Sequence, residues 1–246
     1  MAASPDEGNG RPMSFWADVG RFFADNHQLL LDEAGRQILL SLAAIGAAIV
    51  VAMPIGITVG HLHRWSFLAI NGSNALRALP TLAIIAIGIG IYGLGLVNIW
   101  VALIILALPL ILTNTYVAVD GVSPDMVEAA RGMGMNAWQI VWRVELPTAV
   151  PLIMAGIRTA TVYVIATAYL AGFAGSPGTL GDIITNPGSY QLAGVMAASI
   201  VAVVLAFLAE AVLALAERAV MPKGLALLRA REAAPTVSPA AVAART

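Results

Sequence analysis

The chain has 246 residues, of which 59% are hydrophobic and 11% are charged, and its formal net charge at pH 7 is −1. Soluble domains carry about 25% charged residues, so this composition predicts an all-α integral membrane protein. The near-zero net charge excludes a strongly basic nucleic-acid-binding protein, and the absence of cysteine excludes disulfides and thiolate metal sites.

The N-terminal segment is mixed and polar. Residues 1–13 are small and polar, which predicts a disordered tail, and they have no apolar core of the kind found in a signal peptide. From Ser14 to Leu31, aromatic residues such as Phe15 and Trp16 gather near one helical face, which predicts an amphipathic helix. This helix either lies at the membrane interface or packs on a helix bundle. We therefore expect residues 1–33 to be a tail followed by an amphipathic interfacial helix.

Apolar stretches that can cross a membrane follow in order. At 1.5 Å rise per helical residue, about 20 residues cross a hydrocarbon core of about 30 Å. The stretches are Gln37–Gly60, Ser66–Leu96, Val97–Val119, Thr148–Ala171 and Leu192–Leu215. The second is too long for one straight helix, so we expect a bend at Pro80. Gly56 and Gly60 form a GxxxG pair, which predicts close contact with another helix. The expected fold is a bundle of about five transmembrane helices.

One polar stretch, Asp125 to Pro147, separates the third and fourth apolar spans. Ser123 can cap a helix at its start, and Pro124 suits the first helical position. Gly134 permits a bend, and we expect Pro147 to end a second short helix. The pattern predicts a bent helical segment that protrudes from the membrane and does not span it.

This stretch is similar to the EAA loop of ABC-importer permeases. The motif reads Glu-Ala-Ala, three residues, Gly, nine residues, an aliphatic residue, one residue and Leu-Pro. It is matched here by Glu128, Ala129, Ala130, Gly134, Val144, Leu146 and Pro147, with Val144 where Ile is usual. The resemblance implies a cytoplasmic coupling helix, within the loop 123–147, that docks into a cleft on an ATPase subunit. The alternative is an ordinary surface loop between two membrane helices.

Three further segments narrow the resemblance to the permease subunits of the glycine betaine/choline/proline osmoprotectant branch. They are Arg131–Ala160, Arg77–Ala83 and the end of a Gly-rich loop at Leu180–Ile184. The likeness implies a type I ABC importer permease domain over residues 34–216, followed by a cytoplasmic C-terminal tail over 217–246. It also implies a transporter in the plasma membrane with a second permease subunit (the same or homologous), two ATPase subunits and an extracytoplasmic substrate-binding protein.

On this resemblance the chain translocates an osmoprotectant such as glycine betaine, choline, carnitine or proline. The sequence has no GxxxxGK[ST] phosphate-binding loop, so we expect no enzymatic activity in this chain and no bound cofactor, with ATP and Mg²⁺ on the partner ATPase. Methionine or another small amino-acid-like solute is the alternative substrate. A passive channel and a membrane enzyme are the alternative classes, although no convergent catalytic set supports the enzyme.

Candidate residues also occur inside the apolar stretches. Arg77 and Arg158 each place a charge there, at a cost of several kcal/mol if it stays uncompensated, so they either line the translocation path or meet a structural partner. Tyr163 is a third candidate for the path, since a trimethylammonium group binds aromatic faces. His61 and His63, two residues apart, do not share a helical face and have no carboxylate nearby in sequence, so we expect no metal site.

The distribution of positive charge predicts the orientation, because cytoplasmic loops are enriched in Lys and Arg. With the N-terminus outside, the inner segments hold Arg64, Arg131, Arg143, Arg218, Lys223, Arg229, Arg231 and Arg245, whereas the outer loops around Gly95 and Gly175 hold none. The N-terminal segment, with Arg11, Arg21 and Arg36, counts against this assignment. We expect the EAA loop in the cytoplasm and the N-terminus outside.

Overall fold

The computed structural model describes residues 12–63 and 66–220, and within these ranges the chain is helical and contains no strand. The helices are α1 (Pro12–Asp25), α2 (His27–Leu62), α3 (Ser66–Ala78), α4 (Thr81–Tyr92), α5 (Leu96–Asp120), α6 (Pro124–Gly132), α7 (Ala137–Ile140), the π-helix Val141–Glu145, α8 (Leu146–Thr167), the 3₁₀-helix Ala168–Ala174, α9 (Leu180–Thr185) and α10 (Pro187–Val220). The tails predicted at the two ends lie outside the described residues, except for residues 12–13 in α1 and 217–220 in α10.

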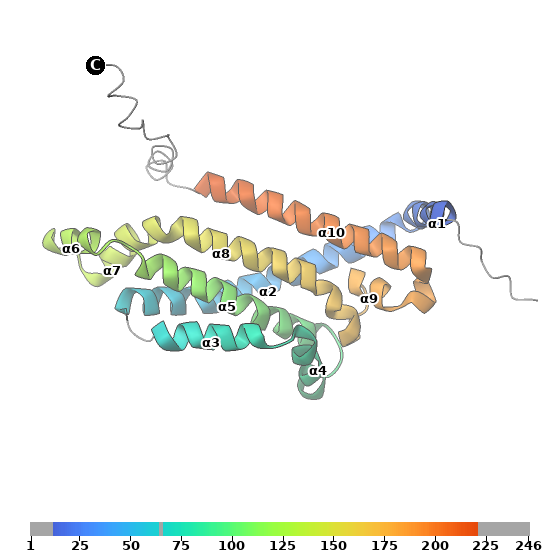
Figure 1. Ribbon diagram of the computed structural model, residues 1–246, viewed down its shortest axis with the longest axis horizontal. Coiled ribbons are helices and arrows are strands. Elements are labelled where there is room, and N and C mark those ends of the chain that lie inside the picture. Colours follow the sequence, from blue (N-terminus) through green and yellow to red (C-terminus); the bar gives the residue numbers. More distant parts are fainter. Residues whose placement is uncertain (1–11, 64–65, 221–246) are drawn as a thin grey trace, which may run out of the picture.

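The long helices run side by side along the longest axis of the molecule (Figure 1). Four helical segments are long and apolar enough to cross a membrane, and α3 with α4, which are bent by 87° relative to each other, make a fifth if the pair counts as one span. The expected bundle of about five spans is thus confirmed, and so is the bend at Pro80. Pro80 has an extended backbone, with ψ of 127°, and it has no N–H with which to continue α3.

Small residues bring α2 and α5 together at the centre of the bundle. Ala44, Ala48 and Ala52 of α2 are fully buried. A Cβ added to Gly56 would lie 2.8 Å from the Cβ of Thr115 on α5, and one added to Gly60 would lie 2.8 Å from Val119 Cβ. Since lipid supplies no hydrophobic drive between helices, such close backbone contact is what holds membrane helices together. The GxxxG prediction is confirmed.

The N-terminal helix differs from the prediction in its end point. It ends at Asp25, so the predicted continuation to Leu31 is wrong, and α2 already begins at His27. Between them Asn26 leaves helical geometry, with φ −121° and ψ 23°, and its side-chain amide donates to the Phe22 carbonyl at 3.2 Å. The helix packs one face on the bundle, because Val19 is only 3% exposed in a cluster with residues of α9 and α10.

Candidate functional site

The polar stretch forms a projecting segment at one end of the bundle (Figure 1). Pro124 occupies the first turn of α6, as predicted, and Asp125 adds an acid there. Ser123 does not cap the helix through its side chain, so that prediction is wrong. Its main-chain carbonyl instead accepts hydrogen bonds from the backbone N–H groups of Met126 and Val127, at 3.1 and 3.3 Å.

Gly134 makes the bend that separates α6 from α7. Its φ is +81°, a left-handed conformation that costs Gly little and other residues more. The turn is closed by the N–H of Met135, which donates to the Ala130 carbonyl at 3.1 Å. Directly after it, Asn136 and Gln139 form a reciprocal capping box at the start of α7, which supplies hydrogen bonds to otherwise unpaired amides.

Pro147 does not end a helix, so this part of the prediction is wrong. The chain passes from α7 through a π-helical turn, Val141–Glu145, directly into α8, and Ala137–Ala174 reads as one membrane-spanning segment. A proline inside a helix lacks an N–H and its ring clashes with the carbonyl four residues earlier. The wider π turn directly before Pro147 relieves both problems without interrupting the helix.

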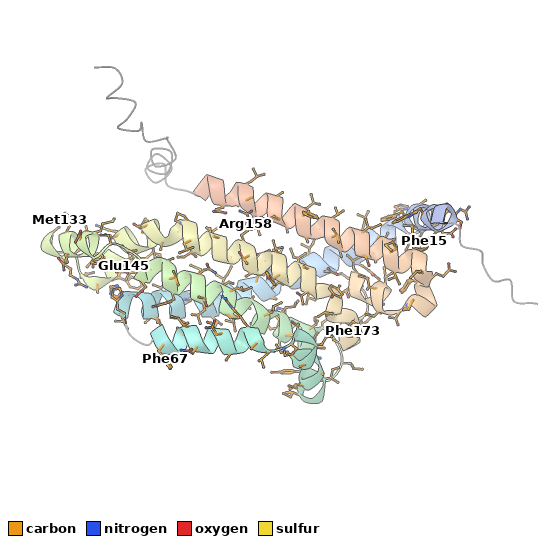
Figure 2. All side chains as sticks on the ribbon, viewed as in Figure 1. Phe15, Phe67, Met133, Glu145, Arg158 and Phe173 are labelled. Carbon is orange, nitrogen blue, oxygen red and sulfur yellow. The ribbon has the colours of Figure 1, made fainter. Side chains whose placement is uncertain are left out.

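The structure places the residues of the EAA motif over the whole projecting segment. Glu128 and Ala129 of α6 are exposed, Ala130 is buried, and Gly134 is exposed at the bend. In the π turn and the start of α8, Val144 and Leu146 are half-buried and Pro147 is exposed. Met133, 71% exposed, marks the tip of the segment (Figure 2). The exposed side chains therefore form a surface that another protein can reach.

Two tryptophans follow the bend on the outer face of this segment. Trp138 and Trp142 are more than half exposed, and their ring centroids lie 5.4 Å apart. Together with Pro54 and neighbouring residues of α2 they line a groove of about 530 Å³. The tryptophans thus border α2 while leaving much of their ring surface open.

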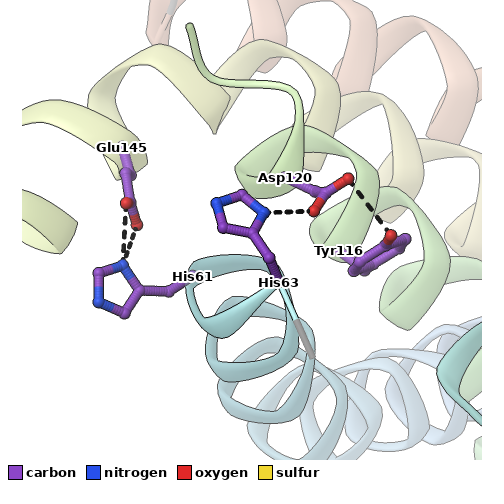
Figure 3. A network of polar contacts seen from close by, with 5 residues as sticks. All are labelled: His61, His63, Tyr116, Asp120 and Glu145. Carbon is purple, nitrogen blue, oxygen red and sulfur yellow. Dashed lines mark hydrogen bonds and ion pairs between the residues drawn. The ribbon is translucent and has the colours of Figure 1, made fainter. Parts of the chain in front are cut away.

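Two histidine–carboxylate pairs fasten this end of the bundle (Figure 3). His61, at the end of α2, has its Nδ1 2.9 Å from both carboxylate oxygens of Glu145 in the π turn. The Glu145 side chain is 4% exposed and that of His61 17%. The pair therefore ties the projecting segment to α2 in a largely buried place, where a hydrogen bond is electrostatically stronger than in water.

The second pair lies beside the first but is open to solvent. His63 Nδ1 is 2.7 Å from Asp120 at the end of α5, and the two side chains are 64% and 37% exposed. Tyr116 donates its hydroxyl to the other Asp120 oxygen at 3.3 Å. The sequence offers no sign of either pair, because the partners are 84 and 57 residues apart in the chain. No cluster of three metal-ligating side chains occurs within the described residues.

The two intramembrane arginines have different partners. Arg158 of α8 forms ion pairs with Glu210 and Glu217 of α10; its Nε lies 2.7 Å from Glu210, and its Nη1 lies 3.1 Å from Glu217. Arg77 of α3 instead donates to the backbone carbonyl of Pro109 on α5 at 3.1 Å. In the part of the chain that the structure describes, Arg77 makes no ion pair.

Arg77 and Tyr163 line the same cavity. Its volume is about 280 Å³, and it lies between α3, α4, α5 and α8. Of the three residues predicted for a translocation path, the structure thus brings two together and places Arg158 elsewhere, against α10. The sequence alone could not pair Arg77 with Tyr163, because they come from helices far apart in the chain.

This arrangement of membrane helices and projecting segment belongs to a known class. Residues 40–222 match the family described as binding-protein-dependent transport system inner membrane component. The chain belongs to this family of transport permeases, which is the family that the motif at Glu128 to Pro147 implies.

Similar proteins of this family are transport permeases whose names give glycine betaine, carnitine or choline as the solute. The chain is 38% identical over 205 residues to the glycine betaine/carnitine/choline transport system permease protein OpuCB of Bacillus subtilis (strain 168), covering 83% of this chain and 94% of that protein. It is 38% identical to the carnitine transport permease protein OpuCB of Listeria monocytogenes, with 86% and 96% covered. It is 37% identical to the choline transport system permease protein OpuBB of B. subtilis, with 86% and 97% covered.

A solved structure shares the fold. The chain superposes on a chain of the MetNI methionine ABC transporter in an inward-facing conformation with a TM-score of 0.68 and 22% sequence identity, covering 80% of this chain and 99% of that one. At this identity the likeness establishes the fold alone, and it confirms the predicted ABC importer permease architecture.

Proposed function

We propose that this chain is the permease subunit of an ABC importer that carries osmoprotectants with a quaternary ammonium group, such as glycine betaine, carnitine and choline. The observation that carries the proposal is the substrate named for relatives that are 37–38% identical over more than four fifths of this chain. Methionine uptake, the alternative, has the support of a fold at 22% identity, which says little about the substrate.

The proposed docking site for the ATPase is the projecting segment, with Glu128, Ala129 and Gly134 at the contact. Glu128 and Ala129 are exposed on α6, and no hydrogen bond or ion pair within the described residues occupies the Glu128 carboxylate. Small side chains let a partner approach the helix closely. The ATPase subunit, and not this chain, binds ATP and Mg²⁺ and hydrolyses the nucleotide.

The remaining partners follow from the class of transporter. A second permease subunit, the same or homologous, completes the membrane passage, and an extracytoplasmic binding protein delivers the solute. The segment α6–α7 faces the cytoplasm and the N-terminus lies outside. Because α1 lies at the end of the bundle opposite to α6 and α7 (Figure 1), this orientation puts α1 at the outer surface, beside the incoming binding protein.

The coupling proposal is tested by reversing a charge that no intramolecular contact requires. Glu128→Lys is expected to abolish uptake of labelled glycine betaine and substrate-stimulated ATP hydrolysis in proteoliposomes that contain the whole transporter, with the permease at its normal abundance. Asp32→Lys is the control, an exposed acid on α2 at the end of the bundle away from α6, and the purified permease should carry as much bound ATPase as the unaltered protein, whereas Glu128→Lys should lose it. Normal uptake by the Glu128→Lys transporter would contradict the docking site.

A second variant tests the bend. Gly134→Val forces a β-branched residue into a conformation with φ of +81°, which such residues rarely adopt. Uptake and recovery of the ATPase with the purified permease should both fall. Gly132→Ala is the control, because Gly132 lies at the helical end of α6 with open space around its Cβ position; equal losses in the two variants would argue against a role for the bend.

A further inference from the structure

The charge of Arg77 is the unusual feature of the membrane region. Arg158 is neutralised by two carboxylates, which is how membrane proteins normally accommodate an intramembrane arginine. Arg77 has one backbone carbonyl as its partner, although a guanidinium carries five N–H donors. The remaining donors make no hydrogen bond to any residue that the structure describes. Arg77 is thus an exposed cation on an apolar stretch, with no counter-ion among the residues that the structure describes.

The space beside Arg77 has the size and lining of a small-molecule site. Its volume of about 280 Å³ is close to the lower end of the roughly 300–1,000 Å³ found for ligand pockets. None of the residues that line it is acidic, so no side chain in the cavity wall competes for the guanidinium. Apart from Arg77 and Tyr163, the lining consists of aliphatic side chains and Pro109.

Tyr163 supplies an aromatic ring to the cavity that Arg77 lines. It lies on α8, the residue is 56% exposed, and its hydroxyl makes no hydrogen bond within residues 12–63 and 66–220. A quaternary ammonium group has no N–H to donate, so proteins bind it through aromatic faces, not through hydrogen-bond acceptors. An anion-binding group and an aromatic ring in one small apolar cavity match a short zwitterion.

We infer that the cavity is a transient substrate site for a zwitterion, in which Arg77 binds the carboxylate and the ring of Tyr163 faces the trimethylammonium group. The inference rests on the proposed function and adds which residue binds which group of the solute. Glycine betaine and carnitine carry a carboxylate and use both residues, whereas choline has a hydroxyl in its place and uses Tyr163 alone. Arg77 then discriminates among the solutes that the relatives carry.

The test measures uptake of labelled glycine betaine and choline in proteoliposomes with the complete transporter. Arg77→Gln should lower glycine betaine uptake about tenfold or more, since a hydrogen bond to a charged group contributes about 1.5–3 kcal/mol, while choline uptake changes less than about twofold. Arg77→Lys keeps the charge and should retain part of the glycine betaine uptake. Tyr163→Leu should lower both uptakes, and Tyr163→Phe should preserve both.

Two controls separate the cavity from general damage. Arg21→Gln removes an exposed arginine of α1 that pairs with Asp18. Tyr169→Leu removes an exposed tyrosine of the 3₁₀-helix that lines a different cavity, which shares no lining residue with the cavity of Arg77 and Tyr163. Neither should change the ratio of glycine betaine to choline uptake. Basal ATP hydrolysis in the two control variants should match that of the unaltered protein, and uptake by every variant is expressed per assembled complex.

Each outcome bears on one idea. Equal losses of glycine betaine and choline uptake in Arg77→Gln would show that Arg77 only holds the Pro109 carbonyl. Unchanged uptake in Tyr163→Leu would show that the ring is not part of the site. Either result overturns the inference.

If the unaltered transporter carries choline alone, the zwitterion site is wrong while the proposed function stands. If it carries glycine betaine alone, retention in Arg77→Lys against loss in Arg77→Gln supports the site, and equal loss overturns it. If it carries neither, the proposed function itself fails.

Discussion

At the scale of single residues, the two histidine pairs beside the projecting segment differ in burial. They therefore differ in how much they stabilise the attachment of that segment. The Glu145 side chain is 4% exposed, whereas the Asp120 side chain is 37% exposed. An exposed ion pair contributes about 0–1 kcal/mol, but removing one partner of a buried pair leaves the other desolvated and unsatisfied. His61 therefore holds the projecting segment against α2, and His63 adds little to that attachment.

This difference gives a matched pair of variants. His61→Ala leaves Glu145 buried without its partner and should cost about 1–3 kcal/mol locally, whereas His63→Ala should cost less than about 1 kcal/mol. Hydrogen exchange of the backbone amides of residues 137–147, followed by mass spectrometry, measures the effect. His61→Ala should speed exchange in this segment by about fivefold or more, and an equal or larger effect of His63→Ala would contradict the assignment.

At the scale of helices, the contact between α2 and α5 depends on two glycines. Gly56 lies against Thr115 and the Leu112 carbonyl, so even one methyl group must push the helices apart. Gly46, on the same helix, has no atom within 4 Å of its Cβ position. The two sites thus differ in packing while sharing the same intrinsic preference for Ala over Gly in a helix.

Gly56→Ala should destabilise the purified permease by about 1–3 kcal/mol through overpacking, and lower its thermal unfolding temperature in detergent. Gly46→Ala should leave that temperature unchanged or raise it slightly, because Ala is the better helix former by about 1 kcal/mol. If both variants behave alike, close contact at Gly56 does not hold the bundle together.

The helices also show where sequence patterns suffice and where they do not. Apolar length and the proline at position 80 are local signals, and they predicted the spans and the bend. The π turn lets the helix continue past Pro147, and Asn26 breaks a helix without a Gly or Pro beside it. Neither feature follows from apolar periodicity or from the usual helix-breaking residues, so both element boundaries were misjudged. The EAA motif could be located from spacing alone, but its anchor, His61 with Glu145, and the cavity shared by Arg77 and Tyr163 arise from contacts between distant segments, which one sequence does not reveal.

At the scale of the whole molecule, the coupling segment and α1 lie at opposite ends of the bundle (Figures 1 and 2). Phe15 on α1 and Met133 beyond α6 mark these two ends in Figure 2. A bundle that spans the bilayer must therefore present them on opposite sides. The orientation that we propose places Met133 in the cytoplasm and α1 outside.

The chain has no cysteine, so a single introduced cysteine reports its own location. In intact cells, a membrane-impermeant maleimide should label Trp16→Cys, whose native side chain is 56% exposed, and should label Met133→Cys, natively 71% exposed, only after the membrane is opened. Labelling of Met133→Cys from outside would reverse the proposed orientation. Labelling of both positions from one side would contradict the arrangement of the spans.

The uninterrupted passage from α7 into α8 has a mechanical consequence. Trp138, next to the bend, and Tyr163, in the cavity wall, belong to one helical span of 38 residues. A docked ATPase that tilts the end of this span near Trp138 would therefore also move Tyr163, because continuous helix joins the two residues. Release of solute from the cavity would then be coupled to each cycle of nucleotide hydrolysis.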